Sequence, residues 1–126
     1  MNYDASIPIY LQVVTAIRKD IASGVLRAGD KLPSGRDLAI RYRINPNTSV
    51  RVYQVLEQEG ICHTKRGLGT FVNEDPGLVD RIRQEMADEL LAYFMQNMRE
   101  LGFTTEEITD MIREEENNDA GKQSNQ

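Results

Sequence analysis

The sequence predicts a mainly α-helical chain with one small β-hairpin, and three observations carry this expectation. Apolar residues recur at three- and four-residue steps in most segments, which is typical of helices that bury one side. Residues that favour helix starts, namely Ser34, Asn45 and Thr104, stand before three of these segments. One short stretch with strand character is interrupted by Gly67 and Gly69, which favours a tight reversal between two strands.

Composition excludes several classes of protein. The chain has 126 residues, of which 40% are hydrophobic, and this fits one domain or one domain with a small appendage. The longest apolar run, residues 90–95, has six residues and is much shorter than the roughly 20 residues that cross a bilayer. Residues 1–25 lack the apolar centre of a signal peptide. We therefore expect a cytoplasmic protein with no membrane partner.

Metal, cofactor and enzymatic sites are not expected. Cys62 is the single cysteine and His63 the single histidine, which leaves too few soft ligands for zinc and no internal disulfide. The two residues are adjacent on a predicted strand, so their side chains point to opposite faces and cannot act together as nucleophile and base. The glycines at 67 and 69 precede no helix and are too closely spaced for a nucleotide-binding loop.

Charge is divided unevenly along the chain. Residues 1–74 hold ten Lys or Arg against seven Asp or Glu, a net charge of +3, whereas residues 75–126 hold five against thirteen, a net charge of −8. Binding to a charged partner depends on the local field. The net charge of −5 for the whole chain therefore does not argue against a nucleic-acid partner for the first half.

The first elements follow from periodicity and turn residues. Apolar residues indicate a helix that begins near Ile9 and is closed by Gly24. Its inward side chains would be Ile9, Val13, Ala16, Ile17 and Ile21. Residues 26–33 have apolar anchors around an Ala-Gly-Asp turn, which suits a short extended arm.

Two closely spaced helices come next. Ser34 is placed to cap a helix over residues 34–42. Asn45 followed by Pro46 is a second start signal, because Asn caps and Pro needs no backbone N–H partner at the first helical position. This third helix should run to about Glu59. The inward side chains would be Leu38, Ala39, Tyr42, Val52, Tyr53 and Leu56.

The remaining elements are a hairpin and two helices. Residues 61–64 and 70–72 indicate two strands around the basic turn 65–69. After a polar hinge, residues 78–101 indicate a long helix. Thr104 and Glu107 form a capping-box pattern for a shorter helix. From Asn117 the tail is polar, and we expect it to be disordered.

Helices 34–42 and 45–59, joined by a tight turn, have the arrangement that places a recognition helix in the DNA major groove. The hairpin would add a wing. The exposed side of the third helix would show Asn47, Thr48, Val50, Arg51 and Gln54. Amide side chains pair with adenine, Arg pairs with guanine or phosphate, and Val can contact the thymine methyl. A solvated polar helix would look similar, so the wing and the caps strengthen the DNA-binding interpretation.

Several motifs in a fixed order extend this interpretation. They are Pro-Ile-Tyr-Leu-Gln-Val at 8–13, Ile-Arg-Lys-Asp-Ile at 17–21, Gly-Val-Leu at 24–26, Gly-Asp-Lys-Leu-Pro-Ser-Gly-Arg-Asp-Leu-Ala at 29–39, Asn-Pro-Asn-Thr at 45–48, Leu-Glu-Gln-Glu-Gly at 56–60 and Gly-Leu-Gly-Thr-Phe-Val at 67–72. With these motifs the chain resembles, over about residues 7–72, the amino-terminal winged helix-turn-helix of the GntR family of bacterial transcription regulators. The Asn-Pro-Asn-Thr motif and Tyr53 resemble its YtrA subfamily, whose members carry a short two-helix extension. Residues 75–126 match such an extension in length, and the subfamily's target operons often encode ABC transporters.

The resemblance also implies a set of DNA contacts. They are Arg36, Asn45, Asn47, Thr48, Arg66 and Gly67. Lys65 beside the wing tip, and Val50 and Arg51 on the third helix, are added from the residue pattern. The alternatives are that Arg36 makes a surface ion pair, and that the cations at 65 and 66 only keep a hairpin tip soluble.

Three positions depart from the family pattern. Gly35 replaces the usual Glu in Leu-Pro-Ser-Glu-Arg, which removes a carboxylate from a helix start. The usual apolar-then-polar order is exchanged at Ser49 and Val50, so a core position becomes polar. The Arg that many members carry at position 50 is absent, so either Arg51 compensates or the base preference differs.

The acidic half carries a wide apolar face. Its main residues are Ile82, Met86, Leu90, Tyr93, Phe94, Met98, Ile108, Met111 and Ile112. One long helix with a short follower buries little surface alone, so we expect two copies to form a helical bundle. The alternatives are that this face packs on the winged domain or that its methionines form an adaptable ligand site. An unknown small-molecule effector could enter there.

These observations give a domain organisation and a function. We expect a winged helix-turn-helix DNA-binding domain at 1–74, a helical dimerisation module at 75–116 and a disordered tail at 117–126. We expect the chain to be a non-enzymatic, homodimeric transcription regulator, a repressor, that binds a palindromic operator in double-stranded DNA. The alternative is a winged-helix module for protein contacts without DNA selectivity.

Overall fold

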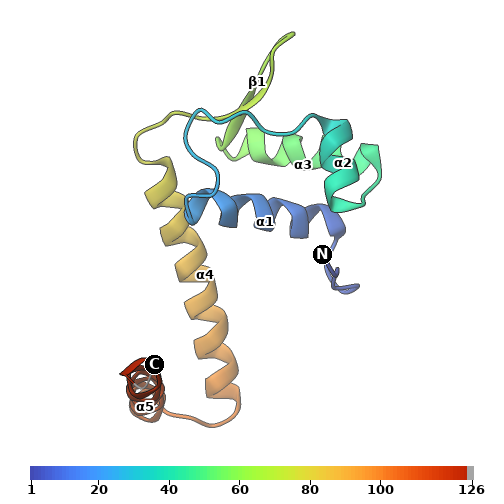
Figure 1. The fold of residues 1–126 in the computed structure, drawn as a ribbon. Coiled ribbons are helices and arrows are strands. Elements are labelled where there is room, and N and C mark those ends of the chain that lie inside the picture. The colour runs from blue at the N-terminus through green and yellow to red at the C-terminus, as the bar shows by residue number, and fades with distance from the viewer. Residues whose placement is uncertain (125–126) are drawn as a thin grey trace. The chain divides into compact units, whose positions relative to one another are not determined.

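The structure is a computed structural model that describes residues 1–124. Its elements are α1 (Ile9–Ala22), α2 (Gly35–Tyr42), α3 (Pro46–Gln58), β1 (Cys62–Lys65), β2 (Gly69–Val72), α4 (Leu78–Glu100) and α5 (Thr105–Ser124), as Figure 1 shows. The predicted fold class, mainly helical with a β-hairpin followed by two helices, is confirmed.

The chain divides into two compact units. The N-terminal unit is Met1–Glu85, and the C-terminal unit begins at Met86. The sequence indicated a boundary after residue 74, whereas the first two turns of α4 belong to the N-terminal unit. The reason is burial, because Leu78 and Ile82 are almost fully buried.

The core of the N-terminal unit lies where α1 and α2 pack against α3. Its largest buried side chains include Val13, Ile17, Ile21, Leu38, Val52, Leu56, Ile61 and Val72. The expected inward face of α1 is largely confirmed, with one exception. Ile9, the first residue of α1, is 45% exposed. Val14, which was not on the expected inward face, is buried.

Strands β1 and β2 form an antiparallel hairpin in which Cys62 pairs with Val72 and Lys65 pairs with Gly69. Lys65 therefore belongs to the strand rather than to the turn. The segment at 29–32 joins the outer edge of the hairpin, since Gly29 N–H donates to the Val72 carbonyl at 2.9 Å and Leu32 N–H to the Thr70 carbonyl at 2.8 Å. The expected extended arm is thus a short segment that hydrogen bonds along the edge of β2.

The C-terminal unit contains the rest of α4 and all of α5. The predicted capping box is present: Thr104 N–H donates to Glu107 Oε1 at 3.0 Å, and Glu107 N–H donates to Thr104 Oγ1 at 3.1 Å. Helix α5 continues to Ser124, whereas we expected disorder from Asn117. Its side chains there are exposed as far as Gly121, so local helix hydrogen bonding rather than burial extends it. Residues 125–126 of the expected tail lie outside the described residues.

In the described part of the chain, no helix combines the length and the apolar character needed to cross a membrane.

Candidate nucleic-acid interface

The helix-turn-helix is built from local capping bonds. Ser34 Oγ accepts from Asp37 N–H at 3.1 Å at the start of α2. Arg43 ends that helix with φ of 54°, in the left-handed region, and Asn45 Oδ1 accepts from Asn47 N–H at 2.8 Å at the start of α3. These bonds turn the chain between α2 and α3 within three residues. Both predicted caps are confirmed, and the side-chain oxygen of Asn45, a residue that the resemblance assigns to DNA contact, accepts a hydrogen bond within the start of α3.

The outward side of α3 carries residue types that read bases. Asn47, Val50, Arg51 and Gln54 are exposed, whereas Thr48 is half-buried. The opposite side, formed by Ser49, Val52, Tyr53 and Leu56, is buried. The predicted division of α3 into two sides is therefore correct except at Thr48, and it includes the exchange that puts Ser49 inside and Val50 outside.

Ser49 is a polar residue in an apolar place. It is fully buried, and among the described residues no group makes a hydrogen bond with its hydroxyl oxygen. A buried hydroxyl without a partner is destabilising. The departure from the family pattern at this position therefore affects the core rather than the surface.

Arg36 lies exposed in the first turn of α2. The neighbouring Gly35 leaves space, because a Cβ there would have no described heavy atom within 4 Å. A glutamate would fit without rearrangement, so packing does not require glycine here, and its presence removes a carboxylate from the helix start.

The wing tip is basic and open. Lys65, Arg66 and Gly67 are all exposed, and Gly67 has φ of 79°, which favours glycine. Lys65 Nζ lies 5.0 Å from the centre of the Phe71 ring, so its stem runs back along the hairpin. Lys65 at the end of β1 and Arg66 in the turn thus present two cations at the tip of the hairpin.

Lys31 is a further cation beside the wing, and the sequence pattern did not indicate its position. Lys31 is exposed and pairs with Phe71 across the edge of the hairpin. A Cβ at Gly69 would come within 2.8 Å of Lys31 Cε, so the lysine lies against the wing. No local pattern indicates that residue 31 joins a hairpin forty residues later.

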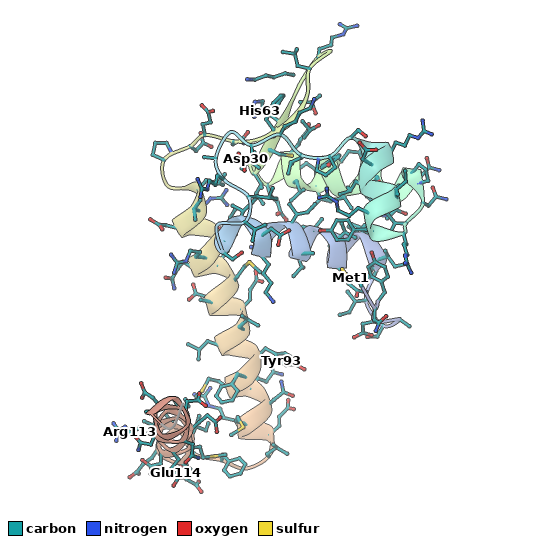
Figure 2. The ribbon with its side chains drawn as sticks, viewed as in Figure 1. Met1, Asp30, His63, Tyr93, Arg113 and Glu114 are labelled. Atoms are coloured by element: carbon teal, nitrogen blue, oxygen red, sulfur yellow. The ribbon has the colours of Figure 1, made fainter. Side chains whose placement is uncertain are left out.

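Cys62 and His63 lie at the base of the hairpin on opposite faces. The Cys62 thiol is buried, and burial raises its pKa to about 12, so it stays protonated and unreactive. The His63 ring Nδ1 hydrogen bonds with Asn73 Oδ1, and Figure 2 shows His63 beside the segment that carries Asp30. Within residues 1–124, no cluster of three or more potential metal ligands was found.

Comparison with known proteins identifies this arrangement. Residues 9–72 match the gntR family, described as bacterial regulatory proteins. The chain belongs to the GntR family. Two relatives from Bacillus subtilis strain 168 support the assignment over most of the chain. One is the uncharacterized HTH-type transcriptional regulator YhcF, 41% identical over 112 residues that cover 89% of this chain and 93% of YhcF.

The second relative is the HTH-type transcriptional repressor YtrA, 36% identical over 112 residues that cover 87% of this chain and 85% of YtrA. This confirms the resemblance to the YtrA subfamily. Among solved structures, a GntR family transcriptional regulator from Listeria monocytogenes is 37% identical with a TM-score of 0.83, over 89% of this chain and 98% of that one. As a member of the GntR family, the chain is a DNA-binding transcription regulator and not an enzyme.

In this GntR-family chain, two residues of the expected dimerisation face are already covered. Ile82, in the N-terminal unit, and Ile108, in the C-terminal unit, are almost fully buried within one copy. The expectation that they belong to an uncovered face is therefore corrected. Met86 and Met98 are half-buried.

The rest of the face remains open in the C-terminal unit. Tyr93 is 69% exposed and projects away from α4 in Figure 2. The other exposed large apolar residues of this unit are Leu90, Leu91, Phe94, Leu101, Met111 and Ile112. An open groove of about 680 Å³ runs between α4 and α5. It is lined by Phe94, Met98, Met111, Ile112, Glu115, Glu116 and Asp119.

Proposed function

We propose that this GntR-family chain is a repressor that binds an inverted-repeat operator as a homodimer. The observation that carries the proposal is the outward side of α3, where Asn47, Val50 and Arg51 are exposed next to a basic wing. In this assignment α3 enters the major groove and samples bases, with Thr48 at its edge. Cations at Arg36, Lys65 and Arg66 contact phosphates and set affinity and register.

The exposed apolar side chains of the C-terminal unit support the homodimer. Soluble monomers rarely expose large contiguous apolar patches, and a second copy of the same unit would cover Leu90, Tyr93 and Phe94 on α4 together with Met111 and Ile112 on α5. A two-fold pair of helical units would place two winged domains on two half-sites. The acidic rim of the groove would keep this module away from DNA phosphates.

The proposals that the chain represses transcription and that it controls a particular kind of operon rest on its similarity to relatives. YtrA is named a transcriptional repressor, and this supports repression by the present chain. The resemblance to the YtrA subfamily extends the proposal to an operon that encodes a transporter. Since a bacterial regulator must reach the chromosome, the protein would work in the cytoplasm. A small apolar effector entering the groove between α4 and α5 would change the spacing of the two winged domains.

Selection of bound duplexes from a random pool tests the DNA-binding proposal. We expect enrichment of a dyad with a fixed half-site spacing. Affinity for the selected duplex should fall steeply between about 50 and 200 mM salt, because many phosphate contacts release counterions. Enrichment of single half-sites would contradict the homodimer. Binding that does not depend on salt would contradict the phosphate contacts.

The matched pair Arg36→Ala and Lys19→Ala tests the mapped contacts. Both residues are exposed cations of the N-terminal unit, but Lys19 lies near the end of α1 and has no proposed contact. We expect loss of operator binding with Arg36→Ala and near-normal binding with Lys19→Ala. Equal effects of the two substitutions would favour a general charge effect and contradict the assignment of Arg36.

Sedimentation tests the homodimer. On an α-helix, residues advance by about 100°, so Ala92 lies on the side of α4 opposite Leu90 and Phe94. We expect Tyr93→Glu to give a monomer and Ala92→Glu to leave the dimer intact.

The alternative function is a protein-interaction module without DNA selectivity. It predicts that no sequence is enriched from the random DNA pool and that a protein partner is captured through α3 or the wing.

A further inference from the structure

Arg51 and Tyr10 come from different helices and lie in direct contact. The Arg51 guanidinium carbon is 3.9 Å from the centre of the Tyr10 ring. Tyr10 is the second residue of α1, where it is half-buried, and Arg51 is exposed on α3. A guanidinium over the face of a tyrosine ring is held by the negative electrostatic potential of that face. The contact therefore fixes where a long, flexible side chain ends.

The contact with Tyr10 displaces the Arg51 guanidinium from the outward side of α3 toward α1. With an advance of about 100° per residue, Asn47, Arg51 and Gln54 lie around the middle of the outward side of α3, opposite its buried residues, and Val50 lies on one flank. Arg51 is displaced from Asn47 by about 40° toward the side of Thr48, and its guanidinium stacks on Tyr10. Since Tyr10 belongs to α1, which packs against the buried side of α3, the guanidinium is pulled away from the middle of the outward side.

A recognition helix in the major groove presents its middle to base edges, and its flanks approach the sugar-phosphate strands. We propose that Arg51 contacts a phosphate and not a base edge, and that Tyr10 is the positioning residue that holds it there. Base discrimination on this part of α3 then rests on Asn47, which lies at the middle of the outward side. The inference rests on the proposed function, in which α3 enters the major groove.

The placement gives Tyr10 a specific role in binding. An arginine that is free in solution loses side-chain entropy when it contacts DNA. Stacking on Tyr10 already restricts Arg51 in the unbound protein, so less freedom is lost on binding. The two residues should therefore act as a coupled pair, and removing either one should remove most of the benefit of the other.

The first experiment measures binding of Arg51→Ala to the selected operator and to every single-base variant of it, at several salt concentrations. We expect a uniform loss, roughly tenfold for all sequences, and a salt slope that is smaller by about one for each subunit. Relaxed preference at one base pair, with other positions unchanged, would overturn the phosphate assignment. Asn47→Ala is the matched control, and it should relax preference at its own base pair.

The second experiment tests the pairing with Tyr10. Tyr10→Phe keeps the ring and should bind like the wild type, whereas Tyr10→Leu should reproduce the uniform loss. In the Arg51→Ala background, Tyr10→Leu should cause little further loss. If Tyr10→Leu weakens binding equally in both backgrounds, its role is structural and the pairing is overturned. Unfolding curves of each variant identify any that fail to fold, and in that case Tyr10→Phe and Arg51→Lys carry the comparison.

The two proposals fail in different ways. If the wild type enriches no sequence, both the operator proposal and this inference fall. If the wild type selects a dyad and Arg51→Ala changes which base is preferred, the operator proposal stands and the phosphate assignment fails.

Discussion

The Tyr53 hydroxyl on α3 donates a hydrogen bond to the carbonyl of Pro33, the residue just before the cap of α2. Tyr53 is buried within the N-terminal unit, and burial raises the pKa of its hydroxyl well above the ordinary value. The hydroxyl therefore remains a donor throughout the physiological range. One side chain thus connects the start of α2 to the middle of the helix that carries the base-reading residues.

Replacing Tyr53 with phenylalanine should weaken the fold. Tyr53→Phe removes the hydrogen bond to the carbonyl of the half-buried Pro33, and a typical intramolecular hydrogen bond contributes about 0.5–1.5 kcal/mol. We expect the free energy of unfolding, measured in urea, to fall by an amount in this range. Tyr10→Phe is the control, since it keeps the ring of a half-buried tyrosine, and it should change stability by less than about 0.5 kcal/mol. An unchanged urea midpoint for Tyr53→Phe would contradict the importance of the bond.

Stability should fall in alkaline solution. Burial raises the pKa of Cys62 from 9.0 to about 12, and it raises the pKa of Tyr53 above 10.0. The folded protein keeps protons that the unfolded chain releases, so unfolding becomes more favourable as the pH rises above about 9. The contribution is complete below that pH and is lost progressively toward pH 12, by up to about 1.4 kcal/mol per pH unit for each group.

Cys62→Ala isolates one of these two groups. Urea unfolding from pH 8 to pH 10 should show a smaller pH dependence for the variant than for the wild type, whatever the variant's absolute stability. Tyr53 still titrates in the variant, so some dependence should remain above pH 10. Parallel curves for the two proteins would show that the thiol does not contribute.

Ser49→Ala should stabilise the protein. The change removes a buried hydroxyl that lacks a described partner and replaces serine by a better helix former. We expect a gain of about 1 kcal/mol in the free energy of unfolding, with operator preference unchanged because residue 49 faces the core. A loss of stability would indicate that the hydroxyl has a partner, such as a buried water.

Two glycines of the wing should respond differently to alanine. Gly69 has φ of 127°, and a Cβ there would come within 2.8 Å of Lys31 Cε. Gly67 has φ of 79° and open space around it. We expect Gly69→Ala to destabilise by about 1–3 kcal/mol and Gly67→Ala to destabilise less. Equal losses in thermal unfolding would contradict the argument from backbone conformation.

Much of the fold could be predicted from the sequence because the signals are local. The caps at Ser34 and Asn45 and the Thr104–Glu107 pair involve residues at most three apart, and each lies where expected. The exposed and buried sides of α3 follow from a period of 3.6 residues. Local signals were less reliable at the ends of elements, as the exposure of Ile9 and the length of α5 show.

The sequence by itself determined the order of the elements, their caps and the residue types available for reading DNA. Tertiary structure alone decided that Lys31 lies against the wing, that Ile82 and Ile108 are covered within one copy, and that Arg51 lies on Tyr10. The physical reason is the range of the interactions. Caps and helical periodicity act within a few residues, whereas these contacts join side chains that become neighbours only when separate elements pack together.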